Sequence, residues 1–239
     1  MWHLGATLPL AHRPAVGGFV ESALVEDRIT PGLYLEMTDL TAAEYAAGRV
    51  PAVLGLPGVD RATWWRNVHR DRSDLPRVLP EFDLLGVYEV QAGFQPPNTS
   101  PGITGHHFVH YRRPGQGIVT GGPTLGLSLV LISPKEPARA QELRDWADFV
   151  HIRHIAAAAV PGYSMITPYE NAAGDDPRFL HFYEMDTDDP ETAFKSMTPL
   201  VMQRIGDQTT PAFKQWASGP SLRIMYVNSF ARIGERTRG

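Results

Sequence analysis

The chain repeats itself, and this repeat constrains its fold more than any other feature of the sequence. The segment that starts at Glu44, EYAAGRVPAVLGLPGV, aligns without a gap to the segment that starts at Asp148, DFVHIRHIAAAAVPGY. An acidic residue followed by an aromatic residue opens both segments, and Pro-Gly closes both. An internal match of this kind indicates two structural units that share one fold.

Segments on either side extend the match. Upstream, GLYLEMTDL from Gly32 resembles GLSLVLISP from Gly126, and downstream, LLGVYEV from Leu84 resembles FLHFYEM from Phe179. Pro and Gly after an apolar helical run are a stop signal for a helix. Each copy therefore predicts a strand, a helix that ends at Pro-Gly, a second strand, and a third strand that contains a Tyr-Glu pair.

The second copy predicts a further helix after the third strand. Asp189 is suited to the N-cap, Pro190 to the first helical position and Glu191 to the first turn. Pro199 should end or kink this helix, because proline lacks the backbone N–H that the helix interior requires. A last strand from Leu222 then completes the order β-α-β-β-α-β.

The first copy predicts a loop at the equivalent place. The segment GFQPPNTSPGITG from Gly93 holds too many prolines and glycines to sustain a helix, so we expect a loop or lid before a strand from His106. The Gly/Pro-rich stretch from Gly115 is a natural linker. We therefore place an N-terminal module with a leader and a lid-like loop at 1–120, and a C-terminal module with a histidine-rich pocket at 121–239.

These elements resemble one branch of a known superfamily. The β-α-β order, the Pro-Gly helix end and the Tyr-Glu strand are similar to the EthD-type branch of the dimeric α+β barrels, over residues 32–93 and 125–232. In that family two ferredoxin-like modules pack sheet against sheet around a pocket, usually across a homodimer. The resemblance implies an α+β fold in which tandem ferredoxin-like modules form an intrachain pseudo-dimeric barrel. Members include polyketide cyclases, cofactor-free monooxygenases, isomerases, lyases and haem-dependent enzymes, so the fold does not select an activity.

Composition excludes several classes of function. A net charge of −4 without a Lys/Arg-rich run argues against nucleic acid as a partner. The absence of cysteine removes disulfides, thiolate metal sites and cysteine nucleophiles. The sequence has no signal-peptide pattern and no run of about 18 apolar residues, so we expect a cytoplasmic protein without a membrane partner. It also lacks a P-loop, a dinucleotide fingerprint, a Gly-x-Ser-x-Gly elbow and a His-Glu-x-x-His motif.

The predicted helix of the second copy carries the densest group of candidate catalytic residues. An α-helix turns about 100° per residue, which places His154 in the apolar stripe that should face the sheet. His151 lies on the edge of that stripe, and Asp148, three residues earlier, is near enough to orient or charge its imidazole. The first copy has Val50 and Ala47 in place of the two histidines. Only the second copy is therefore equipped for acid/base chemistry.

Structural interpretations of these histidines remain open. His154 could be a hydrogen-bonded core residue, and His151 with Asp148 could be a solvated surface pair. Two histidines three residues apart on a helix could also share a metal, but zinc requires further ligands and no third one is suitably spaced. We therefore expect no metal.

Two residues of the third strand add to the predicted pocket. Alternation along the strand from Phe179 places His181 and Tyr183 on one face. If that face looks into the barrel, both side chains join the pocket opposite the helix; otherwise a helix covers them. Gly86 occupies the position of His181 in the first copy, whereas Tyr88 repeats Tyr183, which favours a shared structural role for the tyrosines.

We also expect four residues to contact the substrate. Trp64 and Trp146 belong to this set, and Trp64 could wall a site for aromatic or other apolar compounds, although core packing is the safer interpretation of Trp64. Tyr88 and His110 complete this set. His106 and His110 share a strand face but lie roughly 13 Å apart by the rise of a strand, too far for one metal.

Together these residues predict a cofactor-independent lyase, isomerase or cyclase that acts on a small apolar or aromatic compound. His154 is the expected base or acid, His151 and Asp148 tune it, and His181 or Tyr183 supplies a second proton donor. The first alternative is a haem- or oxygen-dependent oxidative enzyme in which a histidine is an axial ligand or base. The second is a non-enzymatic carrier of a small ligand. A homodimer is compatible with each of them.

Overall fold

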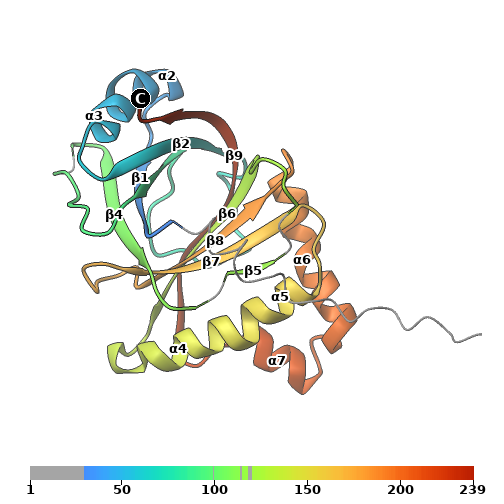
Figure 1. Cartoon of the computed structure of the whole chain (residues 1–239). Coiled ribbons are helices and arrows are strands. Elements are labelled where there is room, and N and C mark those ends of the chain that lie inside the picture. Colours follow the sequence, from blue (N-terminus) through green and yellow to red (C-terminus); the bar gives the residue numbers. More distant parts are fainter. Residues whose placement is uncertain (1–29, 99, 114, 118–119) are drawn as a thin grey trace, which may run out of the picture.

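Every strand that the repeat predicts is present in the computed structural model, which describes residues 30–98, 100–113, 115–117 and 120–239. The leader of the N-terminal module falls largely on residues 1–29, which lie outside the described residues. The strands form one antiparallel sheet that closes on itself as a barrel, and helices cover its outside (Figure 1). The predicted α+β class, with an antiparallel barrel, is confirmed.

Within the described residues, eight strands close the barrel in the order β4-β1-β3-β2-β9-β6-β8-β7, and β7 pairs with β4 to complete the ring. A short strand, β5 (Gln116–Gly117), adds to β7 outside this ring. All of these pairings are antiparallel. The barrel strands are β1 (Gly32–Thr38), β2 (Val59–Asn67), β3 (Leu84–Val90), β4 (Ile103–His110), β6 (Gly126–Pro134), β7 (Tyr163–Asn171), β8 (Phe179–Met185) and β9 (Leu222–Thr237).

The N-terminal half (β1–β4) and the C-terminal half (β6–β9) have the same spatial order of strands. Their registers also correspond, because Tyr34 on β1 lies opposite Tyr88 on β3, and Ser128 on β6 lies opposite Tyr183 on β8. We expected two sheets that face each other. They also join edge to edge, through β2 with β9 and β4 with β7, because each half supplies hydrogen-bond partners for the exposed edge strands of the other.

Side chains from both halves fill the barrel interior. Alternate residues of each strand point inward and form one apolar cluster, in which the aromatic rings of Phe82 and Phe230 stack 5.5 Å apart. The opposite faces of the strands therefore point outward, beneath the helices. Other members of the interior cluster are Leu33, Leu35, Trp65, Leu127, Leu129, Leu180, Phe182 and Tyr226.

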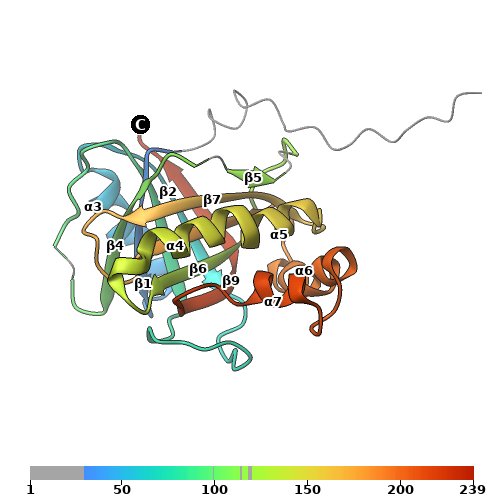
Figure 2. The ribbon, with the colours of Figure 1, turned by 90° about the horizontal axis from the view of Figure 1, so that it is seen from below.

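The two halves differ most in their helices (Figure 2). Within the described residues, two short helices cover the outside of the N-terminal half, whereas four helices cover the C-terminal half. The segment that follows β3 contains no helix in its described residues, as its prolines and glycines predicted. No helix in the described part of the chain is long and apolar enough to cross a membrane. The helices are α2 (Ala42–Glu44), α3 (Val50–Leu54), α4 (Ala140–Trp146), α5 (Arg153–Ala157), α6 (Pro190–Ile205) and α7 (Pro211–Ala217), with a 3-10 turn at Pro137–Arg139.

A π-helical segment interrupts the first described helix of each half. It spans Tyr45–Arg49 between α2 and α3, and Ala147–Ile152 between α4 and α5. A π-turn holds more residues than an α-turn, so every side chain after it is rotated away from the position that an ideal α-helix would give. The prediction for the histidines assumed an uninterrupted α-helix.

Helix α6 begins as predicted, and of the two outcomes expected at Pro199, an end or a kink, the end does not occur. The Asp189 side chain accepts a hydrogen bond from the Thr192 N–H at 3.1 Å, and Pro190 is the first helical residue. The helix does not end at Pro199 but continues to Ile205, where Gly206 with φ 95° stops it. Val201 is buried on the face of α6 that packs against the sheet, and this burial favours the continuation of the helix.

Candidate functional site

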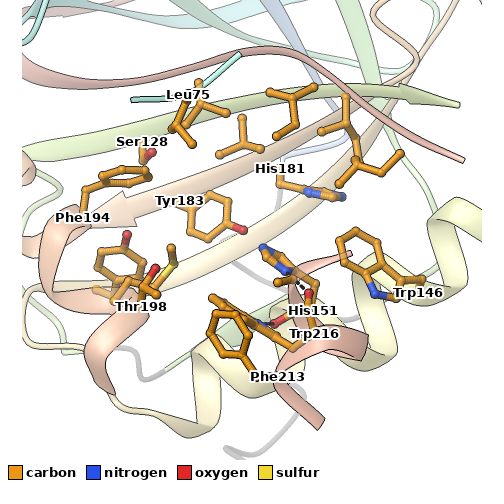
Figure 3. A pocket seen from close by; sticks show the side chains of 18 residues that line it. Leu75, Ser128, Trp146, His151, His181, Tyr183, Phe194, Thr198, Phe213 and Trp216 are labelled. Atoms are coloured by element: carbon orange, nitrogen blue, oxygen red, sulfur yellow. Dashed lines mark hydrogen bonds between the residues drawn. The ribbon is translucent and has the colours of Figure 1, made fainter. Parts of the chain in front are cut away.

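A cavity of about 290 Å³ lies between the outer face of the C-terminal half and its helices (Figure 3). Strands β6, β8 and β9 form one side of the cavity. Helices α4, α6 and α7 and the π-helical segment Ala147–Ile152 form the other side. Among the described residues that line it, none is Lys, Arg, Asp or Glu. The lining residues are Leu75, Ser128, Val130, Ile132, Trp146, His151, Tyr163, His181, Tyr183, Phe194, Met197, Thr198, Phe213, Trp216, Ala217, Leu222, Ile224 and Val227.

Helix α7 closes the cavity on the side away from the sheet. Thr210 accepts a hydrogen bond from the Phe213 N–H at 3.2 Å and caps the helix, and Pro211 occupies its first position. This short helix carries Phe213 and Trp216 into the cavity lining. Helix α7 was not predicted from the sequence, although Thr-Pro is a recognised start signal for a helix.

His151 is held by reciprocal contacts with α7. Its Nδ1 lies 3.0 Å from the carbonyl oxygen of Trp216, and the Trp216 indole N–H donates to the His151 carbonyl at 3.2 Å. The two rings stack 5.1 Å apart, and Trp146 lies 5.0 Å away on another side. Because a carbonyl oxygen only accepts, Nδ1 carries the proton. Nε2 is then the nitrogen with the free lone pair.

The surroundings keep His151 uncharged near neutral pH. Burial lowers the pKa of His151 to about 4, although the Trp216 carbonyl opposes this shift. An imidazole with this pKa is neutral at pH 7, which leaves Nε2 unprotonated, and the same shift makes it a weaker base than a free histidine. His151 therefore has the protonation state and the orientation of a base that faces an apolar cavity.

His181 and Tyr183 enter the same cavity from β8. Their expected shared face is confirmed, but it points outward beneath the helices, because Leu180 and Phe182 on the other face fill the barrel. His181 is 2% exposed, and its Nε2 has no hydrogen-bond partner within the described structure. Burial and then the His151 imidazole lower the pKa of His181 to about 3.

Two tyrosines add hydroxyl groups to the cavity. Figure 3 shows the Tyr183 hydroxyl directed towards the His151 ring. The hydroxyl of Tyr163 is buried without a hydrogen-bond partner among the described residues, and its ring packs edge-on against Tyr183 at 5.9 Å. Burial raises the pKa of Tyr183, so this hydroxyl keeps its proton and can donate it in a hydrogen bond.

The expected inward position of His154 is wrong. His154 is partly exposed on α5 and does not line the cavity. The π-helical segment shifts the buried stripe by one residue, so that Ile152 and Ile155 face the sheet in its place. Burial and the charge of Arg153 lower the pKa of His154.

Asp148 does not orient His151. Its carboxylate accepts a hydrogen bond from the Tyr111 hydroxyl at 3.2 Å, and Arg113 Nε lies 3.7 Å away. Burial raises the pKa of Asp148 to about 6, and the bond from Tyr111 partly offsets this shift. The predicted relay of Asp148 with His151 is therefore not formed, because the π-helical segment turns the two side chains to different sides.

Of the four expected substrate contacts, one lies at the cavity. Trp146 lines it, and its indole N–H donates to the Gln215 carbonyl at 2.8 Å. Trp64 and Tyr88 instead belong to a core cluster beneath the helices of the N-terminal half. His110 lies 5.7 Å from the ring of Tyr169 and contacts the Arg113 carbonyl at 3.1 Å through Nε2.

Lining residues that were not predicted come from elements whose position depends on tertiary packing. They include small or polar residues of β6 and α6 as well as the aromatic residues of α7. Apart from the start signal of α7, no sequence pattern marked them as site residues. The most consequential are Ser128, Tyr163, Thr198, Phe213 and Trp216.

A second cavity, of about 450 Å³, lies between the two halves, where the sequence placed the pocket. Among the described residues that line it none is a histidine, and the charged ones are largely paired with one another. Arg61 contacts Glu89 at 3.0 Å and Glu235 at 3.2 Å, and Arg232 contacts Glu235 at 2.9 Å. The cavity beside His151 is therefore the better candidate for chemistry.

The cavity beside His151 meets one requirement of a haem site and fails another. A histidine whose Nδ1–H is held by a carbonyl is a suitable axial ligand. The two propionates of haem favour cationic partners, and the described lining contains no Lys or Arg. Elsewhere in the described residues, no group of three or more His, Asp or Glu side chains could hold a metal ion.

Comparisons with known proteins reveal a likeness of fold. No protein-family model and no curated protein matches the chain. A solved structure of an anthrone oxidase-like protein has a TM-score of 0.55 at 12% identity, and the match covers 88% of this chain and 96% of that one. A protein described as a monooxygenase from Fusobacterium nucleatum subsp. nucleatum gives 0.48 at 7% (89% and 96% covered). A mutant chlorite dismutase from Candidatus Nitrospira defluvii gives 0.49 at 11% (90% and 96%).

Proposed function

We propose that the protein is a cofactor-independent enzyme that moves a proton on a small, uncharged, aromatic compound, as a lyase, isomerase or cyclase does. One observation carries the proposal. The Trp216 carbonyl fixes the proton of His151 on Nδ1, which leaves the lone pair of Nε2 for a ligand in an apolar cavity. The role of base that the sequence suggested for His154 passes to His151.

The cavity residues can complete a proton transfer. His151 Nε2 would take a proton from a carbon next to a carbonyl group, and the electron pair of that C–H bond would move onto the carbonyl oxygen. The Tyr183 hydroxyl is a donor for that developing negative charge, and His181 is a second polar group at the same side. Return of the proton to another atom gives an isomer without any oxidant.

The lining favours flat and uncharged molecules. Six aromatic residues surround the cavity, and no charged side chain is present among the described lining residues to pair with a carboxylate or phosphate. The likeness to an anthrone oxidase-like protein suggests a useful test compound, since anthrone is a three-ring aromatic ketone with an acidic C–H bond. Anthrone is therefore our first probe of the cavity.

A haem-dependent or oxygen-dependent oxidative enzyme is the second candidate. The held Nδ1–H of His151 would also suit an axial ligand, which is the observation in its favour. An absorption spectrum of the protein mixed with haem separates the two candidates. A Soret band that is shifted from that of free haem, and that His151→Gln returns to the free-haem position, would favour a haem-dependent oxidative enzyme; the unshifted spectrum of free haem would count against haem binding.

We also infer that the chain is a tandem fusion of two ferredoxin-like modules related to the EthD-type branch, divided near residue 120. The equal strand order of the two halves, their corresponding registers and the shared π-helical segment support this inference. A module expressed alone from residue 121 should then pair with a second copy of itself through its open strand edges.

Deuterium exchange tests the proposed function directly. In D₂O the wild-type protein should accelerate exchange of the acidic protons of anthrone, followed by proton NMR. His151→Gln should slow the enzymatic exchange at least about 100-fold, because general-base catalysis contributes that much or more. His154→Gln is the matched control and should exchange at the wild-type rate. Equal rates for wild type and His151→Gln would remove His151 from the mechanism.

A further inference from the structure

We propose that the loop between β2 and β3 sets the size of ligand that the C-terminal cavity accepts, with Leu75 as the selectivity-determining residue and Arg72 as the residue that positions it. We call residues 68–83 the crossing loop, because it leaves the N-terminal half and packs on the C-terminal half. The proposal rests on the proposed function for the location of the ligand.

The crossing loop contributes part of the cavity lining. Leu75 is the one described lining residue that comes from the N-terminal part of the chain. Figure 3 shows it at the edge of the cavity, on the side away from Trp216 and Phe213. A ligand that stacks against the aromatic rings of α7 would therefore reach towards Leu75 with its far end.

Backbone hydrogen bonds attach the crossing loop to β9 at its two ends. The Val68 N–H donates to the Ser229 carbonyl at 3.1 Å, and the N–H groups of Val78 and Leu79 donate to the Met225 carbonyl at 2.9 and 3.0 Å. Leu75 lies between these anchors. Its position therefore depends on side-chain contacts of its neighbours.

Arg72 supplies most of those contacts. Its guanidinium is buried, forms an ion pair with Glu191 in the first turn of α6, and donates to Asn228 Oδ1 at 3.2 Å. It also lies 4.6 Å above the ring of Phe194, which lines the cavity. His69 Nδ1 contacts the other oxygen of Glu191 at 2.9 Å. This cluster ties the loop to the helix that forms the cavity wall.

Binding of two ketones of different size tests the role of Leu75. Isothermal titration with anthrone, which has three rings, and 1-tetralone, which has two, gives a ratio of affinities. Leu75→Ala should raise the ratio in favour of anthrone about tenfold, a typical effect of a few methylene groups in an apolar pocket. Leu75→Trp should weaken the binding of anthrone at least about tenfold and leave the binding of 1-tetralone unchanged.

Val78→Ala is the matched control, because Val78 belongs to the same loop, is 57% exposed and does not line the cavity. It should leave the ratio unchanged. The proposal is overturned if both Leu75 variants keep the wild-type ratio, or if the wild-type protein binds neither ketone. If the wild-type protein does not accelerate proton exchange but the Leu75 variants still change the affinity ratio, the proposed function is wrong and the present proposal is retained.

Two changes at Arg72 distinguish positioning from general stability. Arg72→Gln should move the affinity ratio in the same direction as Leu75→Ala, because the loop loses its ion pair with Glu191. Arg72→Lys keeps a positive charge against Glu191 and should move the ratio less. A lower melting temperature for both variants, with an unchanged ratio, would show that Arg72 only stabilises the fold.

Discussion

The outer faces of the two halves share their strand order and register but differ in how completely they are filled. Beneath the helices of the N-terminal half lies a filled core, whereas the packed core beneath those of the C-terminal half leaves the cavity open. Equivalent positions account for the difference. Tyr34 fills the place that Ser128 leaves open, and Gly86 takes the place of His181. A Cβ atom at Gly86 would overlap the Tyr45 hydroxyl, so only glycine fits there without a shift.

A buried polar network occupies the N-terminal face. Glu36 is fully buried and accepts hydrogen bonds from Arg49 Nε at 2.8 Å and from the Tyr45 hydroxyl at 2.9 Å. The Tyr45 and Tyr88 hydroxyls are 2.7 Å apart. In the aligned sequence, Tyr45 corresponds to Phe149, which is 53% exposed and so fills nothing. One scaffold can therefore use the same face for a satisfied network or for an open site.

Removal of the central carboxylate should have the largest effect. Glu36→Ala leaves Arg49 and two tyrosine hydroxyls without their acceptor, and should lower the free energy of unfolding by about 3–5 kcal/mol. Urea denaturation measures this loss. Val130→Ala changes the equivalent position of the C-terminal half and should lower the free energy of unfolding clearly less than Glu36→Ala does. Equal losses would mean that the two faces do not differ as described.

A tyrosine at position 128, equivalent to Tyr34 of the N-terminal half, should fill the cavity. Ser128→Tyr introduces the side chain that Tyr34 provides in the other half, and it should weaken binding of anthrone at least about 100-fold, or about 2.7 kcal/mol. Titration calorimetry measures the affinity. Tyr34→Ser is the reciprocal control, which should leave binding unchanged while it lowers stability. Wild-type affinity in Ser128→Tyr would place the ligand elsewhere.

Overpacking of the N-terminal face should have an intermediate effect. Gly86→Ala forces Tyr45 away from Glu36, and should destabilise the protein by about 1–3 kcal/mol. Gly48→Ala is the control in the same half, because no atom lies within 4 Å of a Cβ there. It should be neutral or slightly stabilising in thermal or urea denaturation. A neutral Gly86→Ala would show that the network tolerates displacement.

The buried histidine of the C-terminal face should give the protein a pH-dependent stability. The pKa of His181 is about 3 in the folded state and about 6.5 in the unfolded state. Between these two pH values the unfolded chain binds the proton and the folded protein does not. Protonation therefore stabilises the unfolded state, and the free energy of unfolding decreases as the pH falls below 6.5. The slope is at most about 1.4 kcal/mol per pH unit.

His181→Leu should remove that slope. Urea denaturation at several pH values between 4 and 6.5 should give a shallower dependence for the variant than for the wild type. Asp148 acts in the opposite direction, because its pKa is raised to about 6, and it contributes equally to both proteins. The difference between the two curves therefore reports His181 together with its electrostatic coupling to the neighbouring His151, whose pKa is lowered to about 4. Parallel curves would mean that His181 accepts a proton in the folded state.

The amino-acid sequence by itself determined the order of the elements. The repeated segments placed the strands and the two helices that precede Pro-Gly, which end at Leu54 and Ala157, and the Asp189-Pro190 pair placed the start of α6. It also showed that the second copy alone carries histidines at these positions. These features are local, because caps, helix stops and alternation depend on neighbouring residues in the chain.

Only the tertiary structure decided which of those residues share a site. His181 faces outward because apolar residues from both halves compete to fill the barrel, and Leu180 with Phe182 takes that place. The π-helical segment brings His151 to the cavity and leaves His154 outside, and neither a propensity nor a period marks such a turn. Trp216 and Leu75 reach the cavity from distant segments, because contacts across the whole chain set their positions.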